Sequence, residues 1–226
     1  MPLIYQHNIN EHTKLGVWRI KEPEEFFLRR VPLKKDVSHP HKRLQHLAGR
    51  YLLTSMYYDF PLEEILIADT RKPFLENERY HFSISHCGNF AASIVSDSER
   101  VGIDVELVTP KIERVKHKFV HDSELIFINK EYELFLEQFG IREKVNQEFL
   151  TMLWSCKEAI FKWYGLGQMD FKKHMQLTSD IVYSDNGFLE MLFLFTKEQF
   201  IQLKLYSLLF DNFVLSWLST PAIIKL

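Results

Sequence analysis

Two acidic residues alternate with apolar ones in the stretch Gly-Ile-Asp-Val-Glu, residues 102–106. In a β-strand successive side chains point to opposite faces, so Asp104 and Glu106 would share one face while the apolar residues between them face the core. The two carboxylates would then lie about 7 Å apart and could converge on one hard divalent cation. The alternative is a strand with a polar outer face, which the low frequency of Asp in strands disfavours only slightly.

A second set of polar side chains has helical spacing. Trp154, Glu158 and Lys162 stand at i, i+4 and i+8, so on a helix they form one stripe. Glu158 could add a third carboxylate to the cation, and Lys162 could reach an anion bound to the same metal. Lys157 would point to another side of the helix. The alternative is a surface Glu–Lys pair, which contributes only about 0.3–0.5 kcal/mol.

Polar and basic residues elsewhere complete the candidate set. Ser85 and His86 end a predicted strand, and Lys72 precedes Pro73 in a predicted turn, features that are more often structural than functional. Residues 29–50 carry seven Lys or Arg against one Asp, a net +6 in a chain of overall charge −2. This cluster suggests a polyanion site, although charge alone favours a solvated helix face. The basic residues are Arg29, Arg30, Lys34, Lys35, Lys42, Arg43 and Arg50, with His39, His41 and His46 among them.

The elements that must position these residues occur in a similar order twice. Helical periodicity predicts helices over 38–58, with Ser38 as its cap, over 146–164 and, outside the duplication, over 123–145. Strand patterns cover 3–10, 15–20, 64–68, 80–85, 90–96, 101–106, 175–182, 188–195, 201–208 and 213–218. A long helix followed by a meander, occurring twice, predicts an α+β fold. Its two similar halves would be 1–100 and 101–226, each a long helix packed on a mainly antiparallel sheet.

Four short motifs occur in order along the chain. They are Lys-Pro at 72–73, Phe-x-x-Ser-His at 82–86, Gly-Ile-Asp-x-Glu at 102–106 and Trp-x-x-Lys-Glu-Ala-x-x-Lys at 154–162. Their order and separations resemble the 4′-phosphopantetheinyl transferase superfamily, and the length resembles its surfactin-type branch. The resemblance implies a monomer whose two α+β halves are related by a pseudo-twofold axis. The helix over 42–53 also resembles the basic helix that precedes the first motif in this family.

The resemblance further implies a reaction and its residues. The 4′-phosphopantetheine group of coenzyme A would be transferred to a serine of an apo acyl or peptidyl carrier protein, releasing adenosine 3′,5′-bisphosphate. Magnesium would be held by Asp104, Glu106 and Glu158. Lys162 would contact the phosphates, and Glu158 could also accept the serine proton. The implied coenzyme A contacts are Lys72 beside the adenine, Ser85 and His86 at the nucleotide phosphates, and Lys42, Arg43 and Arg50 as candidates for the 3′-phosphate.

Two positions depart from the family pattern. The family often has Gly before Lys-Pro, where this chain has Arg71, and the arginine could add a phosphate or adenine contact. The family often has Ser after Ser-His, where this chain has the similarly small Cys87.

Four basic residues after the Asp-x-Glu strand could face an acidic carrier helix or form a solvated helix face: Lys111, Arg114, Lys116 and Lys118.

The composition disfavours a disordered, secreted, membrane or nucleic-acid-binding protein. With 46% hydrophobic and 26% charged residues, a packed core is expected and disorder is not. Two cysteines, no visible secretory signal and no apolar run of roughly 20 residues predict a cytoplasmic protein without a membrane partner. The alternatives are a non-catalytic binder of coenzyme A or of a carrier protein and, less favoured, a metal-dependent nuclease. The acidic net charge and the lack of a basic stripe interleaved with aromatic residues disfavour a nucleic-acid partner.

Overall fold

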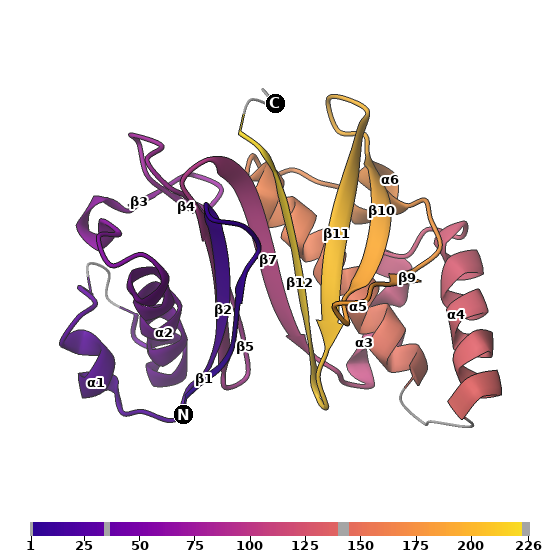
Figure 1. Cartoon of the computed structure of the whole chain (residues 1–226), viewed down its shortest axis with the longest axis horizontal. Coiled ribbons are helices and arrows are strands. Elements are labelled where there is room, and N and C mark those ends of the chain that lie inside the picture. Colours follow the sequence, from indigo (N-terminus) through magenta and orange to yellow (C-terminus); the bar gives the residue numbers. More distant parts are fainter. Residues whose placement is uncertain (1, 34–36, 140–144, 223–226) are drawn as a thin grey trace. The chain divides into compact units, whose positions relative to one another are not determined.

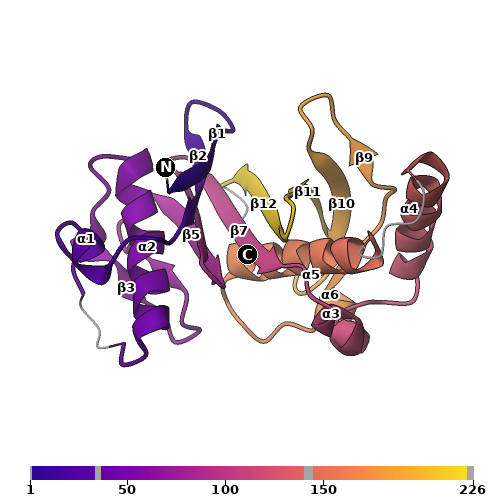
Figure 2. The ribbon, with the colours of Figure 1, turned by 90° about the horizontal axis from the view of Figure 1, so that it is seen from below.

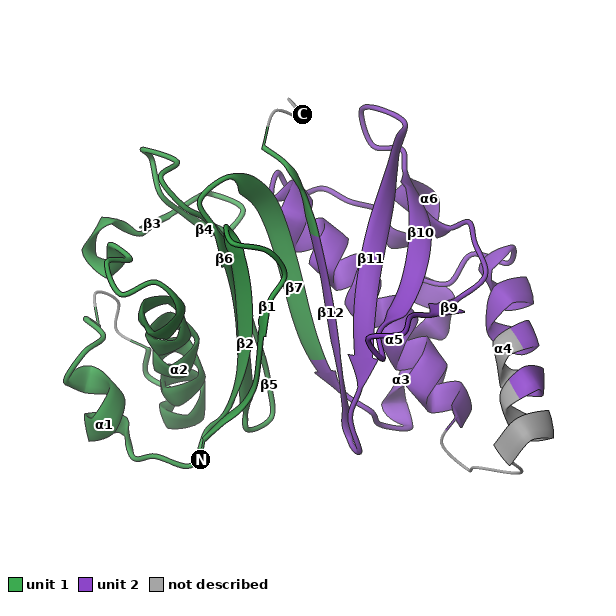
Figure 3. Ribbon diagram, in the orientation of Figure 1, with its two compact units in different colours: residues 1–105, 219–225 green, residues 106–218, 226 purple. Residues whose placement is uncertain are grey.

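The computed structural model describes residues 2–33, 37–139 and 145–222, and the chain divides into two compact units (Figure 1, Figure 3). Unit 1 comprises 1–105 and 219–225, and unit 2 comprises 106–218 and 226. Each unit packs helices on antiparallel strands, so the predicted α+β class with two sheet-bearing halves is confirmed. The chain passes from unit 1 to unit 2 within strand β7 (Glu99–Leu107), whereas the boundary expected from the sequence lies between 100 and 101.

The sheet of unit 1 has four antiparallel strands in the order β1-β2-β6-β5. Their bounds are Leu3–Asn8 for β1, Thr13–Arg19 for β2, His81–Cys87 for β5 and Phe90–Ser96 for β6. The helix α2 (Pro40–Met56) lies against one face of this sheet (Figure 1, Figure 2). Its buried face, which includes Leu47, Leu52 and Leu53, packs into a core with Trp18 and Phe82. The short helix α1 (Glu24–Leu28) adds Phe27 to the same core.

A loop and a hairpin complete the described elements of unit 1 before β5. The 3-10 helix η1 (Leu62–Glu64) leads into the two-stranded hairpin of β3 (Leu66–Ile67) and β4 (Pro73–Phe74). The hairpin turn is closed by hydrogen bonds from the Arg71 amide to the Ala68 carbonyl (2.8 Å) and from the Ala68 amide to the Lys72 carbonyl (2.9 Å). This turn places Arg71 beside the Lys-Pro motif.

In unit 2, antiparallel strands run in the order β12-β11-β10-β8. The helix α5 (Val145–Tyr164) packs across them, as Figure 2 shows for β12, β11 and β10. These are β12 (Phe213–Pro221), β11 (Ile201–Leu209), β10 (Leu189–Phe195) and β8 (Met175–Leu177), and β9 (Val182–Tyr183) also pairs with β10. The core joins Ile160 and Trp163 of α5 to Phe193 and Phe195 of β10. The other helical elements are α3 (Lys111–Val115), η2 (Lys116–Lys118), α4 (Glu124–Phe139) and α6 (Phe171–His174).

The structure differs from the sequence-based expectation at several element ends. The cap of α2 is His39, whose Nδ1 accepts from the Lys42 amide, because Pro40 takes the first helical position and leaves Ser38 one residue too early. The strand expected over 64–68 is present only as the short strand β3, because Glu64 still belongs to η1. The strand expected over 175–182 is split by Thr-Ser-Asp, which favours a turn. The helix α1 was not expected, although Pro23 followed by two Glu residues is a typical helix start.

Within the described ranges, no helix is both long enough and apolar enough to cross a membrane.

Candidate functional site

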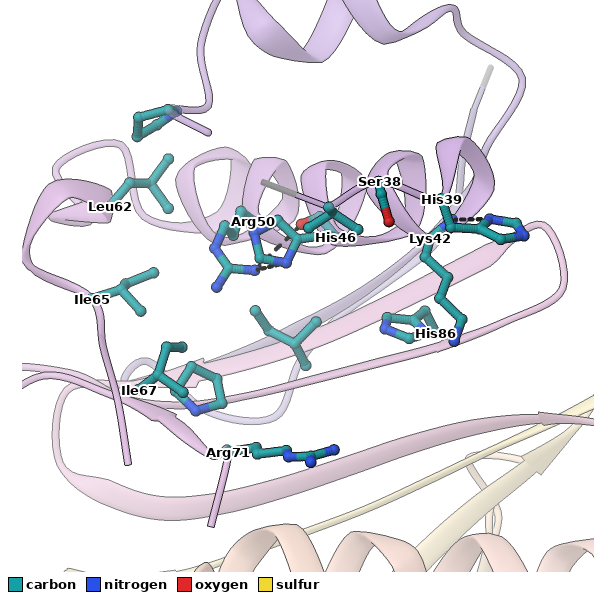
Figure 4. Close-up of a pocket in the computed structure, with 14 residues that line it drawn as sticks. Ser38, His39, Lys42, His46, Arg50, Leu62, Ile65, Ile67, Arg71 and His86 are labelled. Carbon is teal, nitrogen blue, oxygen red and sulfur yellow. Dashed lines mark hydrogen bonds between the residues drawn. The ribbon is translucent and has the colours of Figure 1, made fainter. Parts of the chain in front are cut away.

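A cationic pocket of about 810 Å³ lies in unit 1 (Figure 4). Its walls come from α2 and the segment before it, from η1 and the β3–β4 hairpin, and from β5. Apart from Ser38, the remaining lining residues are apolar, and no acidic side chain is among the lining residues in the described ranges. The basic lining residues are His39, Lys42, His46, Arg50, Arg71 and His86.

One face of α2 supplies half of these basic groups. Lys42, His46 and Arg50 stand at i, i+4 and i+8 and are not buried, whereas Gln45 and Gly49 face the sheet and are buried. Hydrogen bonds fix the helix to the β5–β6 hairpin: Gln45 Nε2 donates to the Gly88 carbonyl at 2.7 Å, and the Ser93 hydroxyl donates to the Gly49 carbonyl at 2.8 Å. The cationic stripe is therefore held over the pocket by contacts on the opposite side of the helix.

Burial lowers the pKa of Arg50 but leaves its positive charge in place at neutral pH. Its guanidinium Nη1 donates to His46 Nδ1 at 3.0 Å, as the dashed line in Figure 4 shows, which requires that this ring nitrogen carry no proton. Desolvation lowers the pKa of Arg50 to about 10, so the residue remains cationic at neutral pH. A partly desolvated cation binds a phosphate more strongly than a fully hydrated one, because less water has to be displaced.

The β3–β4 hairpin brings a further cation to the pocket. Arg71 has φ = 68°, the left-handed conformation that favours glycine, and its side chain lines the pocket (Figure 4). This conformation explains why the family pattern often has Gly at this position. Lys72 follows it, and burial, with a smaller contribution from Arg100, lowers the pKa of Lys72 to about 8.

Strand β5 divides the Ser-His motif between two faces. Ile84 and His86 line the pocket, whereas Ser83 and Ser85 are buried and hydrogen-bonded to β7. Ser85 Oγ donates to Asp104 Oδ1 at 2.7 Å. The sequence therefore places the serine and histidine of this motif in different surroundings, because neighbouring strand residues face opposite ways.

The strand β7 is buried on both faces around the first carboxylate. Asp104 is only 2% exposed, and Gly102, Ile103 and Val105 are also buried. The alternative of a solvated polar face is therefore wrong for Asp104. Glu106, two residues later, is half-buried and accepts a hydrogen bond from Trp154 Nε1 at 3.4 Å.

The stripe expected on α5 is present within unit 2. Between Phe149 and Ile160 the only residues that are not buried are Trp154 and Glu158, and Lys162 continues the half-buried face one turn later. The Trp154 ring packs against Phe119 and Phe171, with ring centroids 5.1 and 5.2 Å away. Because Trp154 also contacts Glu106, this packing places the start of the stripe next to the end of β7.

Lys157 has a structural position that sequence spacing did not reveal. It is fully buried, and its Nζ lies 2.7 Å from Glu124 Oε2, 2.7 Å from the Phe119 carbonyl and 3.1 Å from the Phe171 carbonyl. Glu124 also accepts from the amides of His121 (2.7 Å) and Leu177 (2.8 Å). This network ties α5 to the starts of α4 and α6 and to β8. Spacing predicted only that Lys157 points to another side of the helix than Glu158, and its partner Glu124 lies 33 positions earlier in the chain.

The candidate metal ligands have the chemistry of a hard cation site. Asp104, Glu106 and Glu158 all offer carboxylate oxygens, the ligand type that magnesium prefers. The burial of Asp104 and the orientation of Glu106 by Trp154 fit such a role. Within the described ranges, however, no three His, Cys, Asp or Glu side chains are grouped closely enough to hold an ion.

The other expected residues are placed as follows. Lys42, Arg50 and His86 line the pocket together, whereas Arg43 and Lys72 are not among its lining residues. Arg43 Nε lies 2.8 Å from Glu24 Oε1. Lys34 and Lys35 lie outside the described residues. The four basic residues after the Asp-x-Glu strand are exposed on α3 and η2: Lys111, Arg114, Lys116 and Lys118.

Comparison with known proteins agrees with the motifs. The model of the 4′-phosphopantetheinyl transferase superfamily matches residues 100–217. The 4′-phosphopantetheinyl transferase AcpT of Escherichia coli is 30% identical over 125 residues, which are 55% of this chain and 59% of AcpT. The 4′-phosphopantetheinyl transferase gsp of Aneurinibacillus migulanus is 26% identical over 172 residues, 74% of this chain and 66% of gsp. The alignments thus span less than two thirds of either relative. The family model covers more than half of the residues of this chain, so the chain belongs to the 4′-phosphopantetheinyl transferase superfamily.

Proposed function

We propose that this protein is an enzyme that transfers the 4′-phosphopantetheine group of coenzyme A to a serine of an apo carrier protein. The observation that carries the proposal is the cationic pocket of unit 1, whose described lining residues include six basic side chains and no acidic one, which suits a ligand with several phosphates. Membership of the superfamily supports the reaction type. The two relatives described above are both named as 4′-phosphopantetheinyl transferases.

The pocket residues take separate parts of coenzyme A in this proposal. Lys42, Arg50 and His86 bind the nucleotide phosphates, and Lys72, which follows Arg71 but is not itself a lining residue, lies beside the adenine. Their positions on a rigid helix and on β5 keep the cations in place before the ligand arrives, which lowers the entropy cost of binding. Arg43 pairs with Glu24 and is not among the lining residues, so it is the least favoured of the three candidates for the 3′-phosphate.

The transfer itself requires positioning and charge neutralisation more than covalent help. The carrier serine oxygen forms a bond to the β-phosphorus, and the bond from that phosphorus to the oxygen of the leaving adenosine 3′,5′-bisphosphate breaks. Lys162 offsets charge on the phosphates, and Glu158 accepts the serine proton, directly or through a water. Magnesium, held by Asp104, Glu106 and Glu158, would supply further neutralisation of the pyrophosphate charge.

The partner in this reaction is an apo acyl or peptidyl carrier protein. The exposed basic residues of α3 and η2 suit an acidic carrier helix, since complementary charge speeds association. The monomeric state implied by the family resemblance and the cytoplasmic location expected from the composition remain predictions.

Product release tests the proposal. The purified chain is mixed with coenzyme A, magnesium and each of several apo carriers, and adenosine 3′,5′-bisphosphate is measured by liquid chromatography. We expect product only when a carrier is present.

Because a hydrogen bond to a charged group contributes about 1.5–3 kcal/mol, Arg50→Ala should raise the KM for coenzyme A roughly tenfold or more. Lys42→Ala should act in the same direction, and Lys21→Ala, which removes an exposed lysine outside the pocket, should have no effect. Coenzyme A binding without product for every carrier would instead indicate a non-catalytic binder.

A further inference from the structure

The hydroxyl of Ser85 has a defined place between two strands. Ser85 is 5% exposed and Asp104 is 2% exposed, and Ser85 Oγ donates to Asp104 Oδ1 at 2.7 Å. The same oxygen accepts from the amide of Val105 at 3.2 Å. The serine is thus hydrogen-bonded both to the carboxylate and to the backbone of the strand that carries it.

The number of hydrogens on a serine hydroxyl limits what Ser85 can bind in this arrangement. A serine hydroxyl has one hydrogen to donate, and phosphate oxygens are acceptors. Since that hydrogen is directed at Asp104, Ser85 could donate to a phosphate only by releasing the carboxylate. The side chain also lies on the face of β5 opposite to His86, which lines the pocket. Ser85 and His86 are therefore suited to different tasks.

Comparison with the nearby Ser83 shows which hydrogen bond is particular to Ser85. Ser83 is also buried on β5, and its Oγ accepts from the amide of Ile103 at 3.3 Å, just as Ser85 accepts from Val105. Both serines thus satisfy a β7 amide. Residue 85 is the one whose hydroxyl donates to the candidate metal ligand.

We propose that Ser85 is a positioning residue that fixes the Asp104 carboxylate for a divalent cation. The bond to Oδ1 limits rotation of the carboxylate, and the bond from Val105 fixes the hydroxyl. Hydrogen bonds of this kind to metal-binding carboxylates commonly change metal affinity 10–100-fold when removed. The proposal rests on the assignment of Asp104 as a metal ligand within the proposed function.

Direct metal binding tests this role without relying on transfer. Mn²⁺, whose free form has a strong electron paramagnetic resonance signal, is titrated into the whole chain with coenzyme A present. We expect Ser85→Ala to weaken Mn²⁺ binding by about tenfold, while the KM for coenzyme A at saturating Mg²⁺ changes less than twofold. Ser85→Thr keeps the hydroxyl and should bind Mn²⁺ within about threefold of wild type. Ser83→Ala, the matched control, should bind Mn²⁺ like wild type.

Several results would overturn the proposal. Unchanged Mn²⁺ binding in Ser85→Ala with a raised KM for coenzyme A would show a phosphate contact instead. Equal losses in Ser83→Ala and Ser85→Ala would show a general effect of strand packing. If Ser85→Ala does not fold, Ser85→Cys replaces the hydroxyl by a weaker donor of similar shape, and unchanged Mn²⁺ affinity in it would contradict the proposal. A wild-type chain that binds Mn²⁺ but transfers nothing would refute the proposed function alone. A wild-type chain that binds no Mn²⁺ would refute the positioning role.

Discussion

Gly49 of α2 faces Ile84 of β5 so closely that a Cβ on Gly49 would lie 2.5 Å from Ile84 Cγ2. Since β-carbons do not approach other atoms this closely, only glycine allows the helix to lie at this distance from the sheet. Ile84 also lines the pocket, and Arg50 directly follows Gly49. The glycine therefore sets the distance between the cationic stripe and the pocket wall.

Gly49→Ala should destabilise the protein despite the better helix propensity of alanine. Overpacking costs about 1–3 kcal/mol, which exceeds the roughly 1 kcal/mol that alanine contributes in a helix. The loss should be smaller in an Ile84→Ala background, because Cγ2 is then absent. The free energy of unfolding from urea titrations measures both effects. An equal loss in both backgrounds would mean that contact with Ile84 is not the cause of the destabilisation.

Arg71→Gly should separate backbone strain from charge at the hairpin. The left-handed conformation costs a non-glycine residue about 1–2 kcal/mol, which the higher unfolded-state entropy of glycine partly offsets, so stability should change little or rise. The KM for coenzyme A should rise severalfold because a pocket cation is lost. Arg71→Lys, with the same backbone demand and the charge retained, is the control. If glycine at this position leaves the KM unchanged, Arg71 does not contact the ligand.

The affinity for coenzyme A should fall as the pH rises through about 8. Burial lowers the pKa of Lys72 to about 8, so its ammonium group is charged at pH 7 and mostly neutral at pH 9. Calorimetric titrations at pH 7, 8 and 9 measure this change. Lys72→Met should bind more weakly at pH 7 but show a flatter pH profile. A profile that stays as steep in Lys72→Met would assign the pH dependence to another group.

The same lowered pKa affects stability with a defined sign. Between pH 8 and the ordinary lysine value of 10.5, the unfolded chain binds more protons at Lys72 than the folded chain does. The contribution of Lys72 to the free energy of unfolding therefore rises with pH in this window. Comparing urea titrations of wild type and Lys72→Met at pH 8 and pH 10 isolates it, and no difference between the two proteins would contradict the lowered pKa.

Lys157→Met should destabilise the protein by about 3–5 kcal/mol, because it leaves the fully buried Glu124 carboxylate without its cationic partner. Adding Glu124→Gln should recover part of the loss, since an amide oxygen can still accept from the amide of His121 or Leu177. Urea titrations of the single and double variants measure the coupling. Additive losses would show that the pair is not energetically coupled.

The sequence predicted the parts of the site that depend on local spacing. The α5 stripe of Trp154 and Glu158 and the position of the carboxylates on β7 follow from helical and strand periodicity, and both are observed. The pocket role of Lys42 and Arg50 was expected only from a family resemblance, because charge alone also fits a solvated face. The left-handed conformation of Arg71 was hidden because nothing in the local composition demands it.

Other features depend on contacts between distant segments and could not be predicted from spacing. The hydrogen bond from Ser85 to Asp104 joins residues 19 positions apart, and the pair of Glu124 and Lys157 joins residues 33 positions apart. Burial of Asp104 was missed for the same reason, since alternation predicts which face a side chain occupies but not what covers that face.

The intact mass of the carrier protein shows directly whether the 4′-phosphopantetheine group has been transferred. The purified chain is incubated with magnesium, coenzyme A and apo carriers of the fatty-acid, polyketide and nonribosomal-peptide classes. We expect at least one carrier to gain about 340 Da, the mass of the phosphopantetheine arm transferred in this phosphoryl-transfer chemistry, and Glu158→Gln to lower the yield sharply. A carrier mass that stays unchanged across the whole panel would contradict the proposed transfer.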